Sequence, residues 1–272
     1  MSKNGIKILK VKNGETLDTF FHGRIQVLQR REGYRFAVDA PLLSDFVRTA
    51  PEDGICELGT GNGIVALLLS IKPFARLTAV EIQAVLADIA RRNVMLNNLG
   101  ERITIVRTDL RNWEPEKLFD TIVCNPPYIK MGIGHLSSCE EKAIAKHEVK
   151  VTISEILAKT NALLKENGRA FFIYPKKREA DFDEASKSAG LIPVKIRYIQ
   201  PRADTPANLF LIELIKGKRV DTGHVPTRVP TKGPAPFADT SAENLSPLIL
   251  YDPSGEWSEE AKSIFAGRET TS

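Results

Sequence analysis

Between residues 54 and 215, short apolar runs alternate with stretches of helical hydrophobic period. The runs GICELG, LTAVEI, ITIVRTD, DTIVCN and RAFFIYP are typical of buried strands, whereas residues 84–96 and 152–165 are typical of amphipathic helices. Parallel strands need a crossover connection, which is usually a helix, so this alternation favours a mostly parallel sheet. The sequence therefore predicts an α/β fold with helices on both faces of the sheet.

The segments on either side of this alternation have a different character. TLDTFF and RIQVLQ, separated by Gly23, predict a small β-hairpin, and residues 39–50 predict a short helix with Asp39 as N-cap and Pro41 in its first turn. A stretch rich in Pro, Thr and Gly follows the last strand of the core. We expect four parts: an N-terminal extension (1–50), a core domain (51–216), a linker (217–247) and a C-terminal segment (248–272).

The composition is that of a globular chain. Apolar residues make up 42% and charged residues 26% of the 272 residues, which is enough for a sizeable core. No apolar run is long enough to span a bilayer, and the N-terminus lacks the apolar region of a secretory signal. Cys56, Cys124 and Cys139 are too widely spaced for a metal knuckle, and the first two lie in apolar runs as core residues. We expect a cytoplasmic protein with no membrane span and no metal site.

The first strand of the alternation leads into a glycine-rich stretch, ELGTGNG, which opens a helix. Glycines in this position allow a ligand to approach the backbone closely. A dinucleotide site would place its third glycine one residue later, and a carboxylate at Glu57 would repel a pyrophosphate. That carboxylate would attract a ligand with a positive charge. The candidate cofactor residues of this stretch are Glu57, Gly59, Gly61 and Gly63.

Two further carboxylates end the next two predicted strands. Glu81 lies about twenty residues beyond the glycine stretch, where an acid can bind ribose hydroxyls. Asp109 ends ITIVRTD, where a carboxylate can accept a hydrogen bond from an exocyclic amine. A glycine loop beside three strand-end carboxylates matches a nucleoside with a cationic amino-acid tail. S-adenosylmethionine has this structure, and we expect it to be the cofactor.

A stiff segment, CNPPYIK, follows the fourth strand. Pro126 and Pro127 have no N–H to donate and fix φ twice in succession, so they cannot continue a sheet ladder. They also force the residue before them out of the helical region. The segment therefore holds Asn125 and Tyr128 in a set geometry at a strand end.

These motifs resemble those of the class I, Rossmann-like methyltransferases that use S-adenosylmethionine, over about residues 35–215. NPPY is similar to the fourth motif of the amino-methyltransferases, which act on adenine N6, cytosine N4 or glutamine amides. The resemblance implies a seven-stranded, mostly parallel sheet, preceded here by the small hairpin. It implies that Asn125, beside the cofactor, and the Pro126 carbonyl accept hydrogen bonds from the target NH2. Pro127 would keep these acceptors rigid and Tyr128 would stack on the planar substrate, so that catalysis is mostly positioning.

A narrower resemblance is to the tRNA1(Val) adenine-37 N6-methyltransferases. GYRFAVDAPLLSDFV is similar to their FxxDAxLL pattern, which implies that Phe36 and Asp39 contact the cofactor. AIAKHE is similar to their alanine-rich RHE stretch, with Lys146 where arginine is more usual, and it adds His147 to the candidate substrate residues. PLILYDPSGEWSEEAKSIF resembles their C-terminus, whereas the Pro/Thr-rich linker before it is a departure. The resemblance implies RNA, and tRNA in particular, as the partner.

Basic residues give the physical argument for a nucleic acid. Residues 1–50 hold 9 Lys/Arg against 5 Asp/Glu, whereas residues 217–272 hold 6 against 8. Basic side chains next to aromatic ones, as in FFIYPKKR, can pair with phosphates and stack on bases. Lys176, Lys177 and Arg178 are therefore candidate substrate contacts, although a solvated helix start has the same composition. A base in an anticodon loop is already largely unpaired, so bringing it to Asn125 costs little.

Other functions remain open on the sequence. Protein glutamine N5-methyltransferases share NPPY, but they usually carry a helical N-terminal domain and often read GNPPY, whereas position 124 here is Cys. DNA adenine methylation is a third possibility, and no separate target-recognition domain is evident for it. A non-catalytic RNA-binding module with a methyltransferase fold is disfavoured by the intact NPPY and the three strand-end acids.

Overall fold

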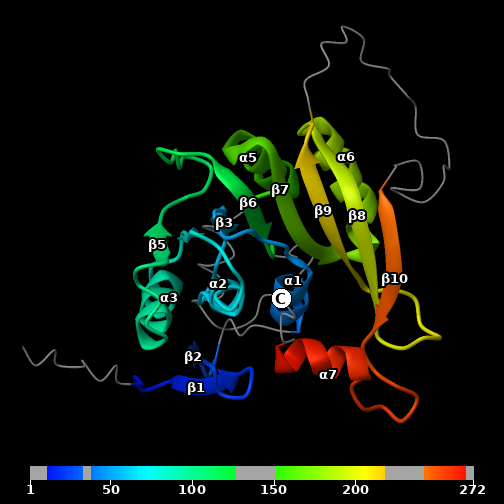
Figure 1. Cartoon of the computed structure of the whole chain (residues 1–272), viewed down its shortest axis with the longest axis horizontal. Coiled ribbons are helices and arrows are strands. Elements are labelled where there is room, and N and C mark those ends of the chain that lie inside the picture. Colours follow the sequence, from blue (N-terminus) through cyan, green and yellow to red (C-terminus); the bar gives the residue numbers. More distant parts are fainter. Residues whose placement is uncertain (1–10, 33–37, 127–150, 218–241, 268–272) are drawn as a thin grey trace, which may run out of the picture.

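The computed structural model describes residues 11–32, 38–126, 151–217 and 242–267, which form a central sheet, flanking helices and a separate hairpin (Figure 1). The strands of the sheet lie in the order β10-β8-β9-β7-β6-β3-β4-β5. Their bounds are β3 (Gly54–Leu58), β4 (Arg76–Glu81), β5 (Ile103–Arg107), β6 (Phe119–Cys124), β7 (Leu164–Pro175), β8 (Leu191–Gln200), β9 (Leu209–Lys216) and β10 (Glu243–Ile249).

The sheet is mostly parallel, as expected. β7, β6, β3, β4 and β5 run parallel to one another, and β9 is antiparallel to both of its neighbours, β7 and β8. The expected number of seven strands is wrong, because β10 adds an eighth strand parallel to β8. β10 begins at Glu243, inside the stretch expected to be linker, and pairing there satisfies its backbone while burying Leu248.

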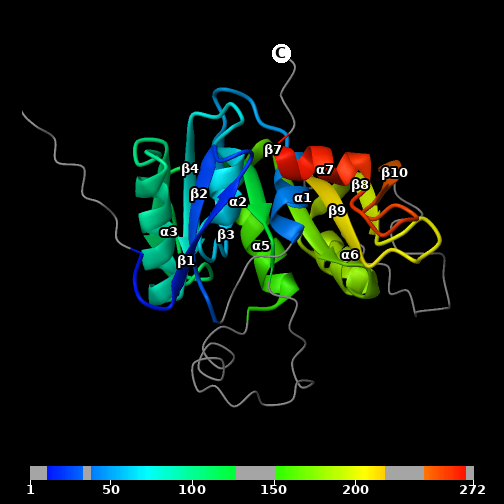
Figure 2. The same ribbon diagram turned by 90° about the horizontal axis from the view of Figure 1, so that it is seen from below.

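Helices cover both faces of the sheet, which confirms the predicted architecture (Figure 2). One face carries α1 (Asp39–Phe46), α2 (Ile64–Leu69), α3 (Ala84–Leu96) and α7 (Glu259–Ala266), and the other carries α5 (Ile153–Leu163) and α6 (Glu179–Ser188). A short 3-10 turn, η1 (Lys176–Arg178), joins β7 to α6. The C-terminal α7 lies beside α1.

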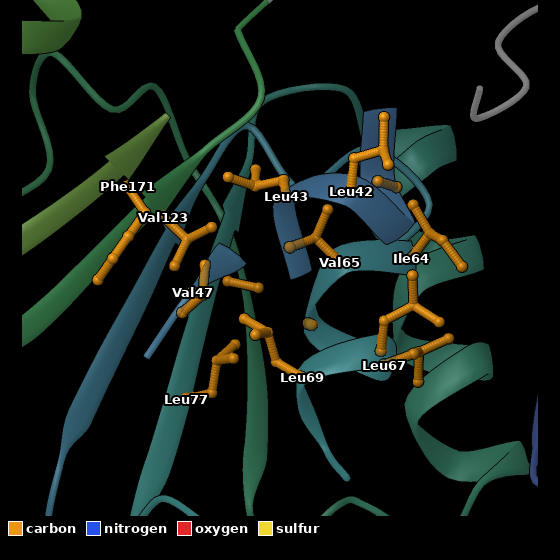
Figure 3. Packing of buried hydrophobic residues seen from close by; sticks show 14 of the residues in the cluster. Leu42, Leu43, Val47, Ile64, Val65, Leu67, Leu69, Leu77, Val123 and Phe171 are labelled. Carbon is orange, nitrogen blue, oxygen red and sulfur yellow. The ribbon is translucent and has the colours of Figure 1, made fainter. Parts of the chain in front are cut away.

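The hydrophobic core consists of two clusters, one on each face of the sheet, because successive side chains of a strand point to opposite faces. On β3, Ile55 packs on the face of α1 and α2, while Cys56 packs on the face of α5. Figure 3 shows part of the first cluster, which contains leucines of α1 and α2 together with Val123 and Phe171 of the sheet. Cys56 and Cys124 are buried, as expected, and burial raises the pKa of both thiols.

The N-terminal hairpin consists of β1 (Glu15–Phe20) and β2 (Ile25–Arg30), paired antiparallel. The following helix has Pro41 in its first turn, but Asp39 is not its N-cap. Val38 holds the cap position without a side-chain hydrogen bond, and Asp39 is the first helical residue. A carboxylate in the first turn is favourable next to the positive end of the helix dipole.

Candidate cofactor and substrate site

The residues expected to bind the cofactor follow neighbouring parallel strands. Leu58 is in register with Val80 of β4 on one side and with Cys124 of β6 on the other. The glycine stretch, Glu81 and Asn125 therefore begin at the same edge of the sheet. This edge is the carboxyl end of the strands, where open α/β sheets bind ligands.

The glycine stretch 59–63, called the cofactor loop from here on, is pinned to the end of β4. The backbone N–H groups of Gly59 and Thr60 both donate to the Val80 carbonyl at 2.9 Å. Gly63 has φ of 87°, and a Cβ there would lie 3.2 Å from the Ala90 Cβ of α3. Glycine at this position permits both the left-handed backbone and the close approach of the helix.

The side chain of Glu57 makes hydrogen bonds that hold the cofactor loop in place. Its Oε2 accepts hydrogen bonds from Thr60 Oγ1 at 2.7 Å and from the Ala66 N–H at 3.0 Å. The side chain is buried, and burial raises the pKa of Glu57 to about 8 although both hydrogen bonds act to lower it. The attraction of this group for a cationic ligand stays a prediction.

Glu81 ends β4 and joins the loop from the other side. Its Oε2 accepts from the Gly61 N–H at 2.9 Å, and its Oε1 accepts from the Gln83 N–H at 2.8 Å. Burial raises the pKa of Glu81, whereas the hydrogen bonds from Gln83 and Gly61 oppose the shift. The carboxylate thus lies against the loop at the position expected of a ribose ligand, and that role stays a prediction.

Asp109 lies beyond the end of β5 and pairs with Arg111. Arg111 Nε donates to both Asp109 carboxylate oxygens at 3.0 Å, and this interaction lowers the pKa of Asp109. The neighbouring Thr108 N–H donates to the Glu81 carbonyl at 3.1 Å, which places the β5 and β4 ends together. Contact with an exocyclic amine would compete with the Arg111 pair.

The sequence motifs did not point to three polar residues of this site, which are Thr60, Asn62 and Asn93. The Asn62 side chain is buried, and neither polar atom of its amide has a hydrogen-bond partner among the described residues. Asn93 of α3 donates from Nδ2 to the Asn62 carbonyl at 2.8 Å. The signal for Asn93 was available, because an asparagine on the apolar face of an amphipathic helix needs a partner.

The remaining candidates are only partly within the described residues. Asn125 and Pro126 come directly after β6, and Pro126 is buried. Asp39 is 9% exposed at the start of α1. The other expected cofactor, catalytic and substrate residues Phe36, Pro127, Tyr128 and His147 lie outside the described residues.

The basic stretch after β7 is largely engaged within the protein. Lys176 forms an ion pair with the buried Glu179 and its Nζ lies 4.5 Å from the centre of the Tyr198 ring. Arg178 pairs with Asp181 at 3.2 Å. Lys177 between them is exposed. Of these three cations, Lys177 is therefore the most accessible to a phosphate.

The sequence profile of the methyltransferase small domain matches residues 38–182, which include the cofactor loop and Asn125. The chain belongs to this methyltransferase family. Two curated relatives are named tRNA1(Val) (adenine(37)-N6)-methyltransferase. The one from Vibrio cholerae is 30% identical over 183 residues, 67% of this chain and 75% of the relative, and the one from a Flavobacteriaceae bacterium is 25% identical over 198 residues, 72% and 84%.

Solved structures share the fold of this methyltransferase. A protein described as a predicted O-methyltransferase from Agrobacterium tumefaciens superposes with a TM-score of 0.61 at 20% identity, covering 85% of this chain and 96% of the other. TYW2 from Pyrococcus horikoshii, solved in complex with MeSAdo, superposes with a TM-score of 0.54 at 16% identity, covering 75% and 72%. The Rossmann-like methyltransferase fold is thereby confirmed.

The methyltransferase uses S-adenosylmethionine, and the site fits that molecule. The unpartnered amide of Asn62 offers a donor and an acceptor in the cofactor loop, and buried polar groups of this kind are normally completed by a ligand or water. Glu81 adds an acceptor beside Gly61. Among the described residues, no helix is both long and apolar enough to cross a bilayer, and no three acidic, His or Cys side chains gather into a metal site.

Proposed function

We propose that this methyltransferase methylates N6 of adenine in RNA, in the anticodon loop of a tRNA, and works in the cytoplasm. The observation that carries the proposal is the position of Asn125-Pro126. They follow Cys124, which is in register with Leu58, the residue before the cofactor loop. A target amine held at Asn125 would therefore lie one strand away from the methyl donor. The names of the curated relatives support the same substrate.

For methyl transfer to an exocyclic amine, the main task of the protein is to position the reacting groups. S-adenosylmethionine supplies an electrophilic methyl group when it is bound. An exocyclic amine is a poor nucleophile because its lone pair is delocalised into the ring. The Asn125 side-chain oxygen and the Pro126 carbonyl would accept the two N–H groups and favour the sp3 geometry in which the lone pair is available. Acceptors held rigid by the two prolines need no reorganisation during the reaction.

The substrate would be held by its phosphates as well as by its base. Lys177 is exposed after β7, and β7 is the strand next to β6 and Asn125. Lysine there would contact the RNA backbone without reading sequence. Its contribution should weaken as salt rises, because phosphate contacts release counterions.

The test is methyl transfer from labelled S-adenosylmethionine to unmodified tRNA, to rRNA and to protein extract, followed by digestion and mass spectrometry. N6-methyladenosine in one tRNA supports the proposal. Label recovered as methylglutamine would assign the chain to protein methylation, and cofactor binding without any transfer would favour a non-catalytic RNA-binding module.

Asn125→Ala is the matched variant for the same assay. It should abolish transfer and leave cofactor binding largely intact, because it removes an acceptor for the substrate. Asn112→Ala, which changes an exposed asparagine after β5, is the control and should transfer as the wild type does. An Asn125→Ala variant with near wild-type transfer would remove the catalytic assignment.

A further inference from the structure

Two asparagines four residues apart, Asn93 within α3 and Asn97 at its C-cap, hold the N-terminal hairpin. Asn93 Oδ1 accepts from the Leu28 N–H at 2.7 Å, and its Nδ2 donates to the Leu28 carbonyl at 2.9 Å. Asn97 does the same for Gln26, at 2.8 and 2.7 Å. Four helical residues rise about 6 Å, and two strand residues about 6.7 Å, so the pairs match in spacing. The two amides therefore occupy the outer edge of β2 as a neighbouring strand would.

The two asparagines differ in their remaining hydrogen bond. Asn97 Nδ2 also donates to the last turns of α3, at the Asn93 carbonyl, at 2.8 Å. Asn93 Nδ2 instead donates to the Asn62 carbonyl at 2.8 Å, inside the cofactor loop. Asn93 is fully buried, so this bond is shielded from water. One side chain thus connects the hairpin to the loop that receives the cofactor.

The cofactor loop needs such a restraint. Gly61 and Gly63 have φ of 59° and 87°, and glycine leaves these peptide planes free to rotate. The Glu81 carboxylate holds the N–H of Gly61, and Asn93 holds the carbonyl of the next residue, Asn62. The loop is therefore held from β4 on one side and from α3 on the other. The peptide that joins Asn62 to Gly63 is held at both ends, by Asn93 at its carbonyl and by the Thr60 carbonyl, which accepts from the Gly63 N–H at 2.9 Å.

A buried ion pair fixes the same helix to the base of the hairpin. Arg92 Nη2 donates to Glu15 Oε2 at 2.8 Å, and both side chains are about one-tenth exposed. The hairpin is thus attached to α3 and its C-cap through Arg92, Asn93 and Asn97. A shift of the hairpin would move Asn93 and, through it, the loop.

We propose that Asn93 is a positioning residue for the cofactor loop, through which the docked hairpin sets cofactor affinity. The inference rests on the proposed methyl-transfer function and its cofactor. It concerns a residue that binds neither substrate nor cofactor itself. Asn97 makes the same hairpin contact without the loop contact, so it separates the two roles.

The experiment compares Asn93→Ala with Asn97→Ala in the full chain. Titration calorimetry gives the dissociation constant for S-adenosylmethionine, and urea unfolding gives stability. Both variants should lose stability. Asn93→Ala should bind the cofactor about tenfold more weakly, the loss expected for one buried hydrogen bond. Asn97→Ala should remain within about twofold of the wild type. With substrate, the KM for the cofactor should rise in Asn93→Ala more than kcat falls.

Two further measurements keep the inference testable if Asn93→Ala does not fold. Asn93→Ser keeps a hydroxyl donor and should fall between the alanine variant and the wild type. In the wild type, the side-chain amide resonances of Asn93 should shift on adding S-adenosylmethionine, and those of Asn97 should shift less. Equal shifts, or equal affinities of the two alanine variants, overturn the positioning role. A wild type that binds no cofactor would overturn the proposed function, and this inference with it.

Discussion

Replacing Glu57 by glutamine is expected to stabilise the protein at neutral pH. Glu57 is 2% exposed, and burial raises its pKa from 4.5 to about 8. The folded state therefore binds this proton more tightly than the unfolded chain does. The contribution of this group to the free energy of unfolding is highest below pH 4.5, where both states are protonated. It is lost as the pH rises through about 8.

The size of this stabilisation depends on how many pH units lie between pH 7 and the pKa of an exposed glutamate. In the unfolded chain at that pH Glu57 is ionised, whereas in the folded state it is mostly protonated. At about 1.4 kcal/mol per pH unit, protonation on folding costs on the order of 3 kcal/mol. Glutamine has an oxygen that can accept from Thr60 and Ala66 and needs no proton. Glu57→Gln should therefore raise the free energy of unfolding by on the order of 3 kcal/mol at neutral pH.

Urea unfolding of the wild type and of Glu57→Gln at several pH values between 4.5 and about 8 tests this. The difference in unfolding free energy should be small at the acid end and should grow toward the alkaline end. Glu116→Gln, at an exposed position, is the control and should show no such trend. A variant no more stable than the wild type at neutral pH, or a difference independent of pH, would refute the reasoning.

Three other substitutions test the packing around the site. Gly63→Ala should lower the free energy of unfolding by about 1–2 kcal/mol for the left-handed backbone alone. It should also weaken cofactor binding in calorimetry, because its Cβ would press on Ala90. Unchanged affinity would contradict the close approach of α3. Glu15→Gln should lower the free energy of unfolding in urea by about 1.5–3 kcal/mol, because it replaces the charged partner of Arg92 and leaves the more distant Asp88 at 3.9 Å, and an unchanged free energy would show the hairpin contact to be weak. Leu248→Ala should cost about 2–5 kcal/mol if β10 is part of the core, and a silent substitution would show that the C-terminal segment is dispensable.

Much of the local structure could be predicted from the sequence because it depends on local patterns. The helix expected at residues 84–96 is α3, with the same bounds. The glycine loop between β3 and α2 and the carboxylate at the end of β4 were likewise expected, since parallel strands bring their carboxyl ends to one edge. The start of α1 was misplaced by one residue, because an acid at a helix start serves equally as a cap or as a first-turn residue.

The partners of individual polar groups could not be predicted in this way. Lys176 was expected to contact a substrate, and in the structure it forms an ion pair with Glu179. Glu57 was expected to attract a ligand, and it also holds the loop through Thr60 and the first turn of α2 through Ala66. Such pairings depend on which side chains the fold brings within hydrogen-bond distance. The composition of a sequence segment does not give these distances.

The sequence by itself determined the succession of strands and helices from β3 to β9 and the glycine-rich loop between β3 and α2, whereas the acceptor role of Asn125 stays a prediction. Hydrophobic period and the limits that glycine and proline place on φ act over a few residues, so they can be read directly from the chain. The tertiary structure alone decided that β10 joins the sheet and that Asn93 ties the hairpin to the cofactor loop. These contacts join residues far apart along the chain, and they form because a buried backbone group must find a partner wherever the packed elements provide one.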